Sequence, residues 1–349
     1  MGFPFGDVGF MIKESFSFSS ADVTYYFNAD FDFLEKLVSK EQAVIVTDEN
    51  IFAKHQEKFA GWKTIVIKAG EQFKVQATAD DIIQKLIDLG ADRKTTLIGV
   101  GGGVITDITG YLAGVFMRGV KSGFVPTSIL AMTDAAIGGK NGIDVGLYKN
   151  MVGLIRQPAF LLYDFFLLKS LPRQEWVNGF AEVIKHACIK DAVMFSLLEN
   201  NTLSFFQKDD TALSKLIQRN ALLKTKVVIG DEFENSERKL LNFGHTLGHA
   251  IENVYHLPHG HAVSIGMVAA CKISEQVTGF KDTDRVVNVL EQYGLPVQFD
   301  FDKAKALEIL KSDKKKDNQS INYILLKKIG EAAIVSLPLT EIETLIDEL

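Results

Sequence analysis

The sequence predicts a two-domain protein in which a parallel α/β half is followed by a mainly helical half. The chain has 349 residues, and because a single core stops growing at about 250–300 residues, this length favours two domains. Short β-rich runs alternate with amphipathic segments as far as Pro172, whereas beyond it the apolar residues recur at helical spacing. We therefore expect domains at residues 1–172 and 173–349, separated by a change of structural class.

Four short apolar runs predict the strands of the first domain: 43–47 (AVIVT), 64–67 (TIVI), 95–100 (TTLIGV) and 123–125. A helix is expected between the second and third runs, where Ile82 and Leu86 have helical spacing and Gly90 provides a stop. The second domain carries apolar stripes of period 3.6, such as Leu213, Leu216, Ile217, Leu222 and Leu223. Residues 321–326 and 332–335 are typical of a late hairpin, whose place in the fold stays open.

The charge and cysteine content exclude several classes of protein. A formal net charge of −6 disfavours generic nucleic-acid binding. The longest stretch without Asp, Glu, Lys or Arg, residues 253–271, contains three histidines and Pro258, so we expect no membrane span. Two cysteines cannot form a disulfide scaffold and the N-terminus lacks a secretion signal, so we expect a cytoplasmic protein.

A glycine-rich turn follows the third predicted strand. Gly101, Gly102 and Gly103 would let the backbone approach a pyrophosphate and present the amides of the next helix to it. The G-x-G-x-x-G fingerprint fails at Val104, so a tight turn without a ligand is the alternative interpretation. The turn alone does not decide between the two.

Two carboxylates are expected at the same edge of the predicted sheet as this turn. Asp48 follows the first strand and Glu71 follows the second, where an acid can hold ribose or nicotinamide-side hydroxyls. Lys74 lies one helical step beyond Glu71 and could instead pair with it on a solvated surface. Both interpretations stay open here.

Five of the seven histidines lie between positions 245 and 261, which indicates metal or acid–base chemistry. Asn242, His245 and His249 are spaced by three and four, so a helix would place them on one face. Thr246 follows His245, so the zincin H-E-x-x-H motif is absent and a metalloprotease is disfavoured.

Glu182 is a candidate for the carboxylate ligand of such a metal. A helix that begins near Pro172 would align Glu182 with Lys185 and His186, and the alternative interpretation is a surface Glu–Lys pair. Two histidines and a glutamate are a known ligand set for a catalytic divalent ion. Glu182, one helical histidine and one histidine of the HLPHGH loop would supply it.

Several cations lie in glycine-, asparagine- or histidine-containing stretches, whereas solvating Lys and Arg are usually scattered over helix faces. They are Arg118, Lys140, Lys149, Lys185, Lys224 and Arg238. Asp134 and Asn150 share one of these stretches with Lys140 and Lys149. Each cation alone could solvate a loop, but their occurrence together with the metal candidates indicates an anionic substrate.

A series of motifs in this order resembles the 3-dehydroquinate synthase family: GGGVITD, MRGV, FVPTSILAMTDAAIGGK, YKNMVG, GFAEVIKHA, RKLLNFGHTLGHAIE and HGHAVSIGM. The resemblance covers about residues 40–320. It implies an α/β N-terminal Rossmann-like NAD-binding domain followed by an all-helical C-terminal metal/substrate domain, with the active site between them. It also implies a homodimer.

The resemblance implies zinc or cobalt held by Glu182, His245 and His259. The last ligand is the first histidine of the family pattern H-G-E-A-V, which here reads His259-Gly260-His261, so His261 is the alternative ligand.

The resemblance also implies the residues that contact the substrate and NAD. His249 matches an acid–base or substrate-hydroxyl partner, and Arg118 matches a phosphate contact made across the dimer. The substrate-binding positions are Asp134, Lys140, Lys149, Asn150, Lys185, Lys224, Arg238 and Asn242, with one further phosphate contact from Lys314 or Lys315. The NAD-contacting positions are Asp48, Glu71, Lys74, Gly102, Gly103, Asp107, Thr127 and Ser128.

The implied reaction takes a seven-carbon 2-keto sugar acid 7-phosphate. It oxidises one ring hydroxyl with bound NAD, eliminates phosphate, re-reduces the ketone, and opens and recloses the ring as a carbocycle. Thr106, Asn141 and Tyr148 depart from the family pattern, which bears on the identity of the substrate.

The alternative functions are another sugar-phosphate cyclase such as 2-deoxy-scyllo-inosose synthase, a polyol dehydrogenase of the glycerol dehydrogenase type, and a non-catalytic NAD- or zinc-binding sensor. The sensor is disfavoured because it needs no such complete polar set.

Overall fold

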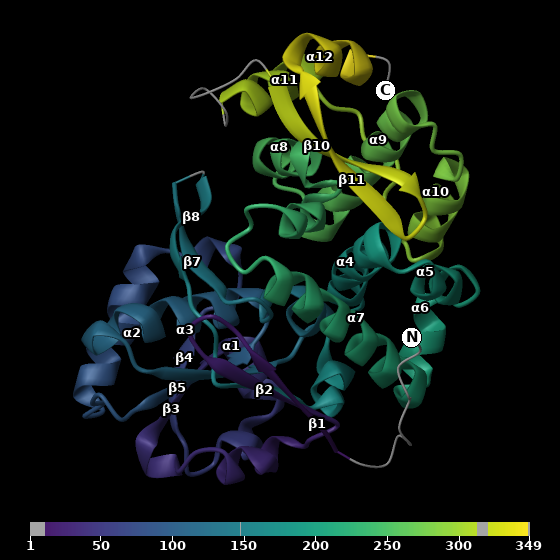
Figure 1. Ribbon diagram of the computed structural model, residues 1–349. Helices are drawn as coiled ribbons and strands as arrows, with labels where there is room; N and C mark the ends of the chain where they lie inside the picture. The colour runs from purple at the N-terminus through teal and green to yellow at the C-terminus, as the bar shows by residue number, and fades with distance from the viewer. Residues whose placement is uncertain (1–10, 147, 313–319, 348–349) are drawn as a thin grey trace. The chain divides into compact units, whose positions relative to one another are not determined.

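The computed structural model describes residues 11–146, 148–312 and 320–347 (Figure 1). It divides into two compact units. The first combines the described residues up to Pro172 with Asp210–Phe233, and the second combines Arg173–Asp209 with the described residues from Glu234 onward. The domain boundary at residue 172 stays a prediction.

The first unit is built on a sheet whose described part has seven strands in the order β1-β2-β9-β6-β5-β3-β4. These strands are β1 (Ile12–Ser17), β2 (Asp22–Phe27), β9 (Phe160–Tyr163), β6 (Lys121–Pro126), β5 (Thr96–Gly101), β3 (Ala43–Asp48) and β4 (Lys63–Ile67). Only the β1–β2 pair among them is antiparallel. The parallel α/β sheet predicted from the four apolar runs is confirmed.

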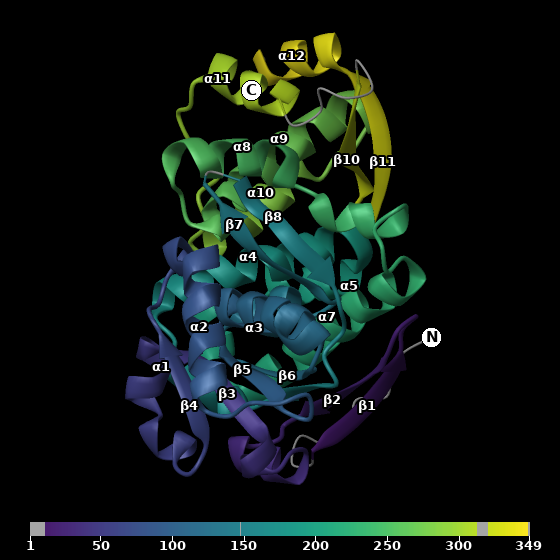
Figure 2. The same cartoon turned by 90° about the vertical axis from the view of Figure 1, so that its left-hand side faces the viewer.

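Both faces of this sheet are covered at its centre, which explains why strands such as β3 and β5 are buried almost without interruption. Val44 and Val46 of β3 share a core with helices α2 (Gln76–Asp88) and α3 (Gly103–Val115), whereas Ile45 belongs to a separate core on the opposite face (Figure 2). The predicted helix ends as expected, because Gly90 has a φ of 69°, a backbone conformation that favours glycine.

A helix from later in the sequence, α7 (Asp210–Gly230), also belongs to the first unit. It packs against the π-helical turn η6 (Ala131–Ala135), and the Tyr25 hydroxyl of β2 lies 2.9 Å from the Thr225 hydroxyl. The hairpin of β7 (Lys140–Val145) and β8 (Tyr148–Ile155) packs on α3. The described residues of these two strands form a separate two-stranded sheet.

The second unit is largely helical. Its helices are α4 (Arg173–Lys190), α5 (Ala192–Glu199), α6 (Leu203–Lys208), α8 (His245–Tyr255), α9 (His259–Thr278), α10 (Thr283–Gln292), α11 (Lys303–Ser312) and α12 (Leu339–Asp347). The expected late hairpin, β10 (Ser320–Lys328) and β11 (Glu331–Pro338), belongs to this unit, which is therefore not entirely helical. Ser274 and Thr278 of α9 hydrogen-bond the backbone of Leu326 and so hold β10 on that helix.

Helices α8 and α9 approach each other closely because glycines lie at their contact. A Cβ atom at Gly266 would lie 1.9 Å from the carbonyl oxygen of Gly244, and one at Gly248 would lie 3.0 Å from that of Ala262. Only glycine fits at position 266, and a side chain at position 248 would make a tighter contact than most Cβ atoms do. This contact places the N-terminal residues of α8 and α9 close to each other.

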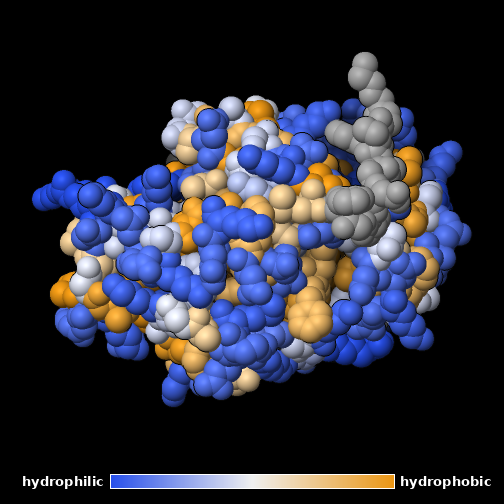
Figure 3. All heavy atoms as spheres, turned by 90° about the horizontal axis from the view of Figure 1, so that it is seen from below, coloured by the Kyte–Doolittle hydropathy of each residue, from blue (hydrophilic) through white to orange (hydrophobic). Residues whose placement is uncertain are grey.

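On the face drawn in Figure 3, the described hydrophobic residues lie in groups among hydrophilic ones. In the described part of the chain, no helix is both long enough and apolar enough to cross a bilayer.

Candidate metal and nucleotide sites

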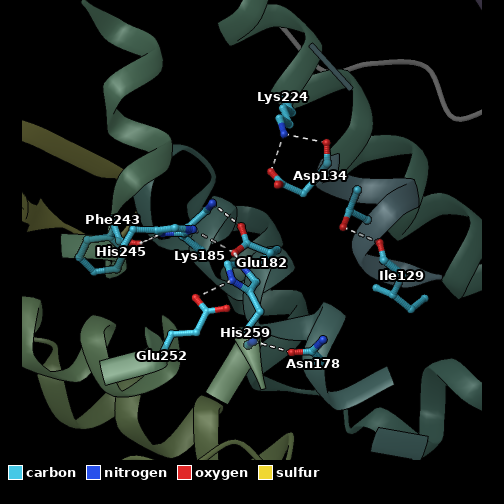
Figure 4. A network of polar contacts seen from close by, with 12 residues as sticks. Ile129, Asp134, Asn178, Glu182, Lys185, Lys224, Phe243, His245, Glu252 and His259 are labelled. Carbon is cyan, nitrogen blue, oxygen red and sulfur yellow. Dashed lines mark hydrogen bonds and ion pairs between the residues drawn. The ribbon is translucent and has the colours of Figure 1, made fainter. Parts of the chain in front are cut away.

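Three side chains of the types that can bind a metal ion converge in the second unit (Figure 4). Glu182 lies in the middle of α4, His245 is the first residue of α8 and His259 is the first residue of α9. Their ligand atoms all lie within 4.8 Å of one another. The Nε2 atoms of His259 and His245 lie 3.1 and 3.5 Å from the same carboxylate oxygen, Oε1 of Glu182. Two imidazoles and one carboxylate are a donor set that suits Zn²⁺ or Co²⁺ and leaves a position for substrate.

Local backbone geometry places both histidines at helix starts. Gly244 adopts a left-handed φ of 77° immediately before His245, and Pro258 precedes His259. The prediction that Asn242 shares a helix face with His245 and His249 is wrong, because Asn242 ends the 3₁₀ helix η8 (Glu237–Asn242) and the turn at Gly244 separates it from α8. His259 was expected in a loop, but it begins α9.

Lys185 forms an ion pair with Glu182 one helical turn away. The Lys185 and Glu182 side chains are 2% and 0% exposed, so the interpretation of a solvated surface pair is wrong. Burial, reinforced by the Lys185 cation, holds the pKa of His245 well below its usual value. Burial also lowers the pKa of His259, but hydrogen bonds to Glu182 and Glu252 outweigh it and raise this pKa to about 10.

Among the described residues, His261 lies in none of the groups whose ligand atoms converge, although it was the alternative third ligand. It is partly exposed, and burial lowers its pKa. The convergence therefore favours His259, and the ligand assignment stays a prediction.

A nucleotide site is expected where the order of a doubly wound sheet reverses, at the carboxyl ends of its strands. Here β3 leads outward to β4 while β5 lies on the other side of β3, so the reversal falls between β3 and β5. Asp48 ends β3, Gly102 follows β5 and caps α3, and Thr127 follows β6 with its N–H donating to the Gly101 carbonyl over 2.9 Å. The structure thus places these three predicted NAD contacts at one edge.

The glycine turn presents the start of α3, a helix of 13 residues whose first amides lack intrahelical acceptors. A Cβ atom at Gly103 would lie 3.3 Å from Cβ of Ala135, and one at Gly102 would lie 3.5 Å from the Ser128 hydroxyl oxygen. Asp48 uses Oδ1 to accept hydrogen bonds from the N–H groups of Asn50 and Ile51, which holds its carboxylate at the sheet edge.

Lys74 joins three further predicted residues into one cluster. Its Nζ atom lies 2.5 Å from Oδ2 of Asp107, 2.6 Å from Oδ1 of Asn150 and 3.8 Å from Oε1 of Glu71. Since the Lys74 side chain is only 4% exposed, its interpretation as half of a solvated surface pair is wrong. Burial raises the pKa of Asp107 to about 6.

The predicted substrate cations differ in burial. Lys224 of α7 is buried and bonds both the carbonyl oxygen and Oδ1 of Asp134, at 2.7 and 2.6 Å. Arg238 is buried in η8, whereas Lys140 and Lys149 are exposed on the β7–β8 hairpin. Arg118 is exposed and has a φ of 67°. Lys314 and Lys315 lie outside the described residues.

Comparison with known proteins identifies the family. Residues 64–178 match the family described as 3-dehydroquinate synthase N-terminal, and residues 179–316 match 3-dehydroquinate synthase C-terminal. The chain belongs to the 3-dehydroquinate synthase family. A 3-dehydroquinate synthase from Pyrococcus furiosus is 39% identical over 313 residues, which are 87% of this chain and 91% of that protein.

Two solved structures of related cyclases resemble this member of the 3-dehydroquinate synthase family. The 2-epi-5-epi-valiolone synthase from Streptomyces hygroscopicus subsp. jinggangensis, with NAD⁺ and Zn²⁺ bound, is 26% identical and has a TM-score of 0.85, covering 96% of this chain and 98% of that one. A 2-deoxy-scyllo-inosose synthase complexed with carbaglucose-6-phosphate, NAD⁺ and Co²⁺ has a TM-score of 0.84, covering 97% and 100%. At 24% identity, the second comparison shows a shared fold alone.

The three residues that depart from the 3-dehydroquinate synthase pattern differ in their surroundings. Asn141 is buried and donates through Nδ2 to the carbonyls of Gly139 and Arg156, over 2.6 and 2.9 Å, which ties β7 to the end of β8. Thr106 donates to the carbonyl of Gly103 within its own helix. Tyr148 is 62% exposed on β8.

Sequence reasoning missed two glutamates beside the predicted residues. Oε2 of Glu252 lies 3.4 Å from Nδ1 of His259, and Oε1 of Glu234 accepts a hydrogen bond of 2.6 Å from the Asn242 amide. Glu252 is part of the motif NFGHTLGHAIE and follows His249 by three positions on α8, which was the available signal. Glu234 lies outside any regular element, so nothing local indicated it.

Proposed function

We propose that this protein catalyses the 3-dehydroquinate synthase reaction of the shikimate pathway, which leads to chorismate and the aromatic amino acids. In it, 3-deoxy-D-arabino-heptulosonate 7-phosphate becomes 3-dehydroquinate and phosphate by transient oxidation, phosphate elimination, re-reduction and intramolecular aldol closure. The supporting observation is the convergence of Glu182, His245 and His259 in a chain of this family.

NAD and a divalent zinc or cobalt ion are the cofactors that we propose. When bound, NAD would take up and return a hydride, and the ion would acidify a substrate hydroxyl. Glu182, His245 and His259 would hold the ion. The start of α3 and the carboxyl edge of the sheet would hold NAD, and the NAD⁺ and Zn²⁺ bound by the 2-epi-5-epi-valiolone synthase support this pairing.

The substrate would be a small anionic sugar phosphate, because cations of this chain are buried. Lys185, Lys224 and Arg238 are 2, 6 and 2% exposed; Lys185 and Lys224 also pair with Glu182 and Asp134, so the substrate anion would share these two cations with the carboxylates. Lys140, Lys149, Asn150, Asp134 and Asn242 would bind the remaining hydroxyl, carboxylate and phosphate oxygens. His249 is exposed one turn into α8 and would transfer a proton to or from a substrate hydroxyl.

We also propose a cytoplasmic homodimer. Strand β8 exposes Tyr148, Met151 and Val152, with 62, 62 and 40% of their surfaces accessible. A strand with exposed apolar side chains is typical of a pairing edge. A second copy would cover it, and Arg118 would then reach the phosphate bound by its partner. Met151→Lys should yield a monomer in light scattering, and a dimer of unchanged affinity would contradict this interface.

One reaction mixture tests the proposed activity by following phosphate and NADH together. The heptulosonate phosphate should release one phosphate per molecule consumed, with only a trace of NAD required and no accumulation of NADH. A matched His245→Ala protein should release none. NADH formed one-for-one without phosphate would overturn the proposal in favour of a polyol dehydrogenase, and phosphate release from other sugar phosphates alone would indicate another cyclase.

A further inference from the structure

The two histidines of the metal site have the same arrangement of contacts around their rings. Each directs Nε2 toward Oε1 of Glu182, and each has an oxygen atom beside Nδ1. For His245 this is the Phe243 carbonyl oxygen at 3.1 Å, and for His259 it is Oε2 of Glu252 at 3.4 Å (Figure 4). A histidine that binds a metal ion through Nε2 is a neutral imidazole whose single N–H lies on Nδ1, and an acceptor beside Nδ1 favours that tautomer.

We propose that Glu252 is a positioning residue for the metal ion, which fixes the ring orientation and tautomer of His259. This inference rests on the ligand set proposed above. A carboxylate or carbonyl acceptor on the second nitrogen is the usual support of a metal-binding histidine. Glu252 acts through His259 and does not itself ligate the ion.

The surroundings of Glu252 suit this role. Glu252 is 3% exposed, and a buried carboxylate is costly unless it is hydrogen-bonded. It lies on α8, the helix that begins with His245, while His259 begins α9. The close approach of these helices at Gly248 therefore fixes the Glu252 carboxylate relative to both ligands.

The acceptors beside Nδ1 of His245 and His259 differ in charge, so their effects on metal binding can be separated. Phe243 offers a neutral carbonyl to His245, whereas Glu252 offers an anion to His259 and so makes His259 the more electron-rich ligand. Glu252→Gln keeps an oxygen acceptor of the same length and removes the charge. Glu252→Ala removes both.

The test measures metal affinity, independently of turnover. The full chain is stripped with a chelator, and its affinities for Co²⁺ and Zn²⁺ are measured by competition with a chromophoric chelator, together with the Co²⁺ absorption spectrum. We expect E252A to bind each ion about 10–100-fold more weakly, and E252Q to be intermediate. The control variant is E275Q. Glu275 is exposed on α9, about 24 Å along this helix from His259, so E275Q should bind both ions with wild-type affinity.

The outcomes distinguish this inference from the ligand set. Wild-type affinity in folded E252A, or in E252Q where the alanine variant does not fold, would overturn the role of Glu252. Two ions per wild-type chain, one of them lost in E252A, would also overturn it, because His249, Glu252 and His259 would then ligate a second ion. Wild-type affinity in E182A would overturn the ligand set itself, whereas metal loss in E182A alone would leave that set standing.

Discussion

Replacing Lys185 by methionine tests the electrostatics of the metal site, because it removes a charge at nearly constant volume. Without a metal ion, the variant leaves the carboxylate of Glu182, which is 0% exposed, without the Lys185 cation and with His245 and His259 as its neighbours. Breaking a buried pair by removing one partner costs about 3–5 kcal/mol. The second unit has roughly 150 residues, so this corresponds to a fall in Tm of about 6–20 °C.

A bound divalent ion should reverse much of this loss, because it supplies positive charge to Glu182 in place of Lys185. If metal binding stabilises folded K185M more than it stabilises the folded wild-type protein, then K185M must bind the metal more tightly. K185M should therefore bind Zn²⁺ at least about tenfold more tightly than wild type. Its kcat/KM should nevertheless fall by about two to three orders of magnitude, since the substrate anion loses a buried cation.

The assay is thermal unfolding with a chelator and with saturating Zn²⁺, combined with a chelator competition for affinity. Lys190→Met is the matched control, because Lys190 lies on the same helix and pairs with Glu237 at the surface, with side chains 27 and 51% exposed. An exposed pair contributes about 0–1 kcal/mol, so the control should change little. A weaker Zn²⁺ affinity in K185M, or a metal-free Tm within about 2 °C of wild type, would refute the reasoning.

Three further predictions concern the other predicted residues. Alanine at Glu182 should abolish metal binding while alanine at His261 leaves metal content near wild type, as elemental analysis of the purified proteins would show. Arg238→Ala should fold but lose about two to three orders of magnitude in kcat/KM in a phosphate-release assay. Burial raises the pKa of Asp107 from 3.8 to about 6, so the stability that its protonated form contributes is complete below pH 3.8 and is lost as the pH rises through 6. Denaturant midpoints between about pH 4 and 7 should therefore fall in wild type relative to D107N, and parallel curves would contradict this.

Local sequence patterns predict the parallel core of the first unit but not the elements whose partners are distant in the chain. Uninterrupted apolar runs such as β3 arise because both faces of the sheet are covered, and this signal is strong. The β1–β2 hairpin was not predicted, although β2 alternates between buried and more exposed positions; β1 has no fully buried residue, and the turn between the strands contains no glycine, proline or asparagine. Helix α7 joins the first unit through contacts such as Tyr25 with Thr225, separated by 200 residues, and no local pattern records such a separation.

Residue spacing predicts which side chains share a helix face, but it does not predict how deeply that face is buried. Glu182 and Lys185 have the spacing of a surface ion pair, yet every residue from 176 to 189 of α4 is buried. The signal was present in the neighbours: Phe180, Ala181 and Val183 surround Glu182 on several sides of the helix, and a helix that is apolar all round lies in a core. A charged pair inside such a helix needs partners from other helices, because burying it otherwise costs too much. The histidines at the starts of α8 and α9 are such partners, so the depth of α4 itself points to the site that these residues form.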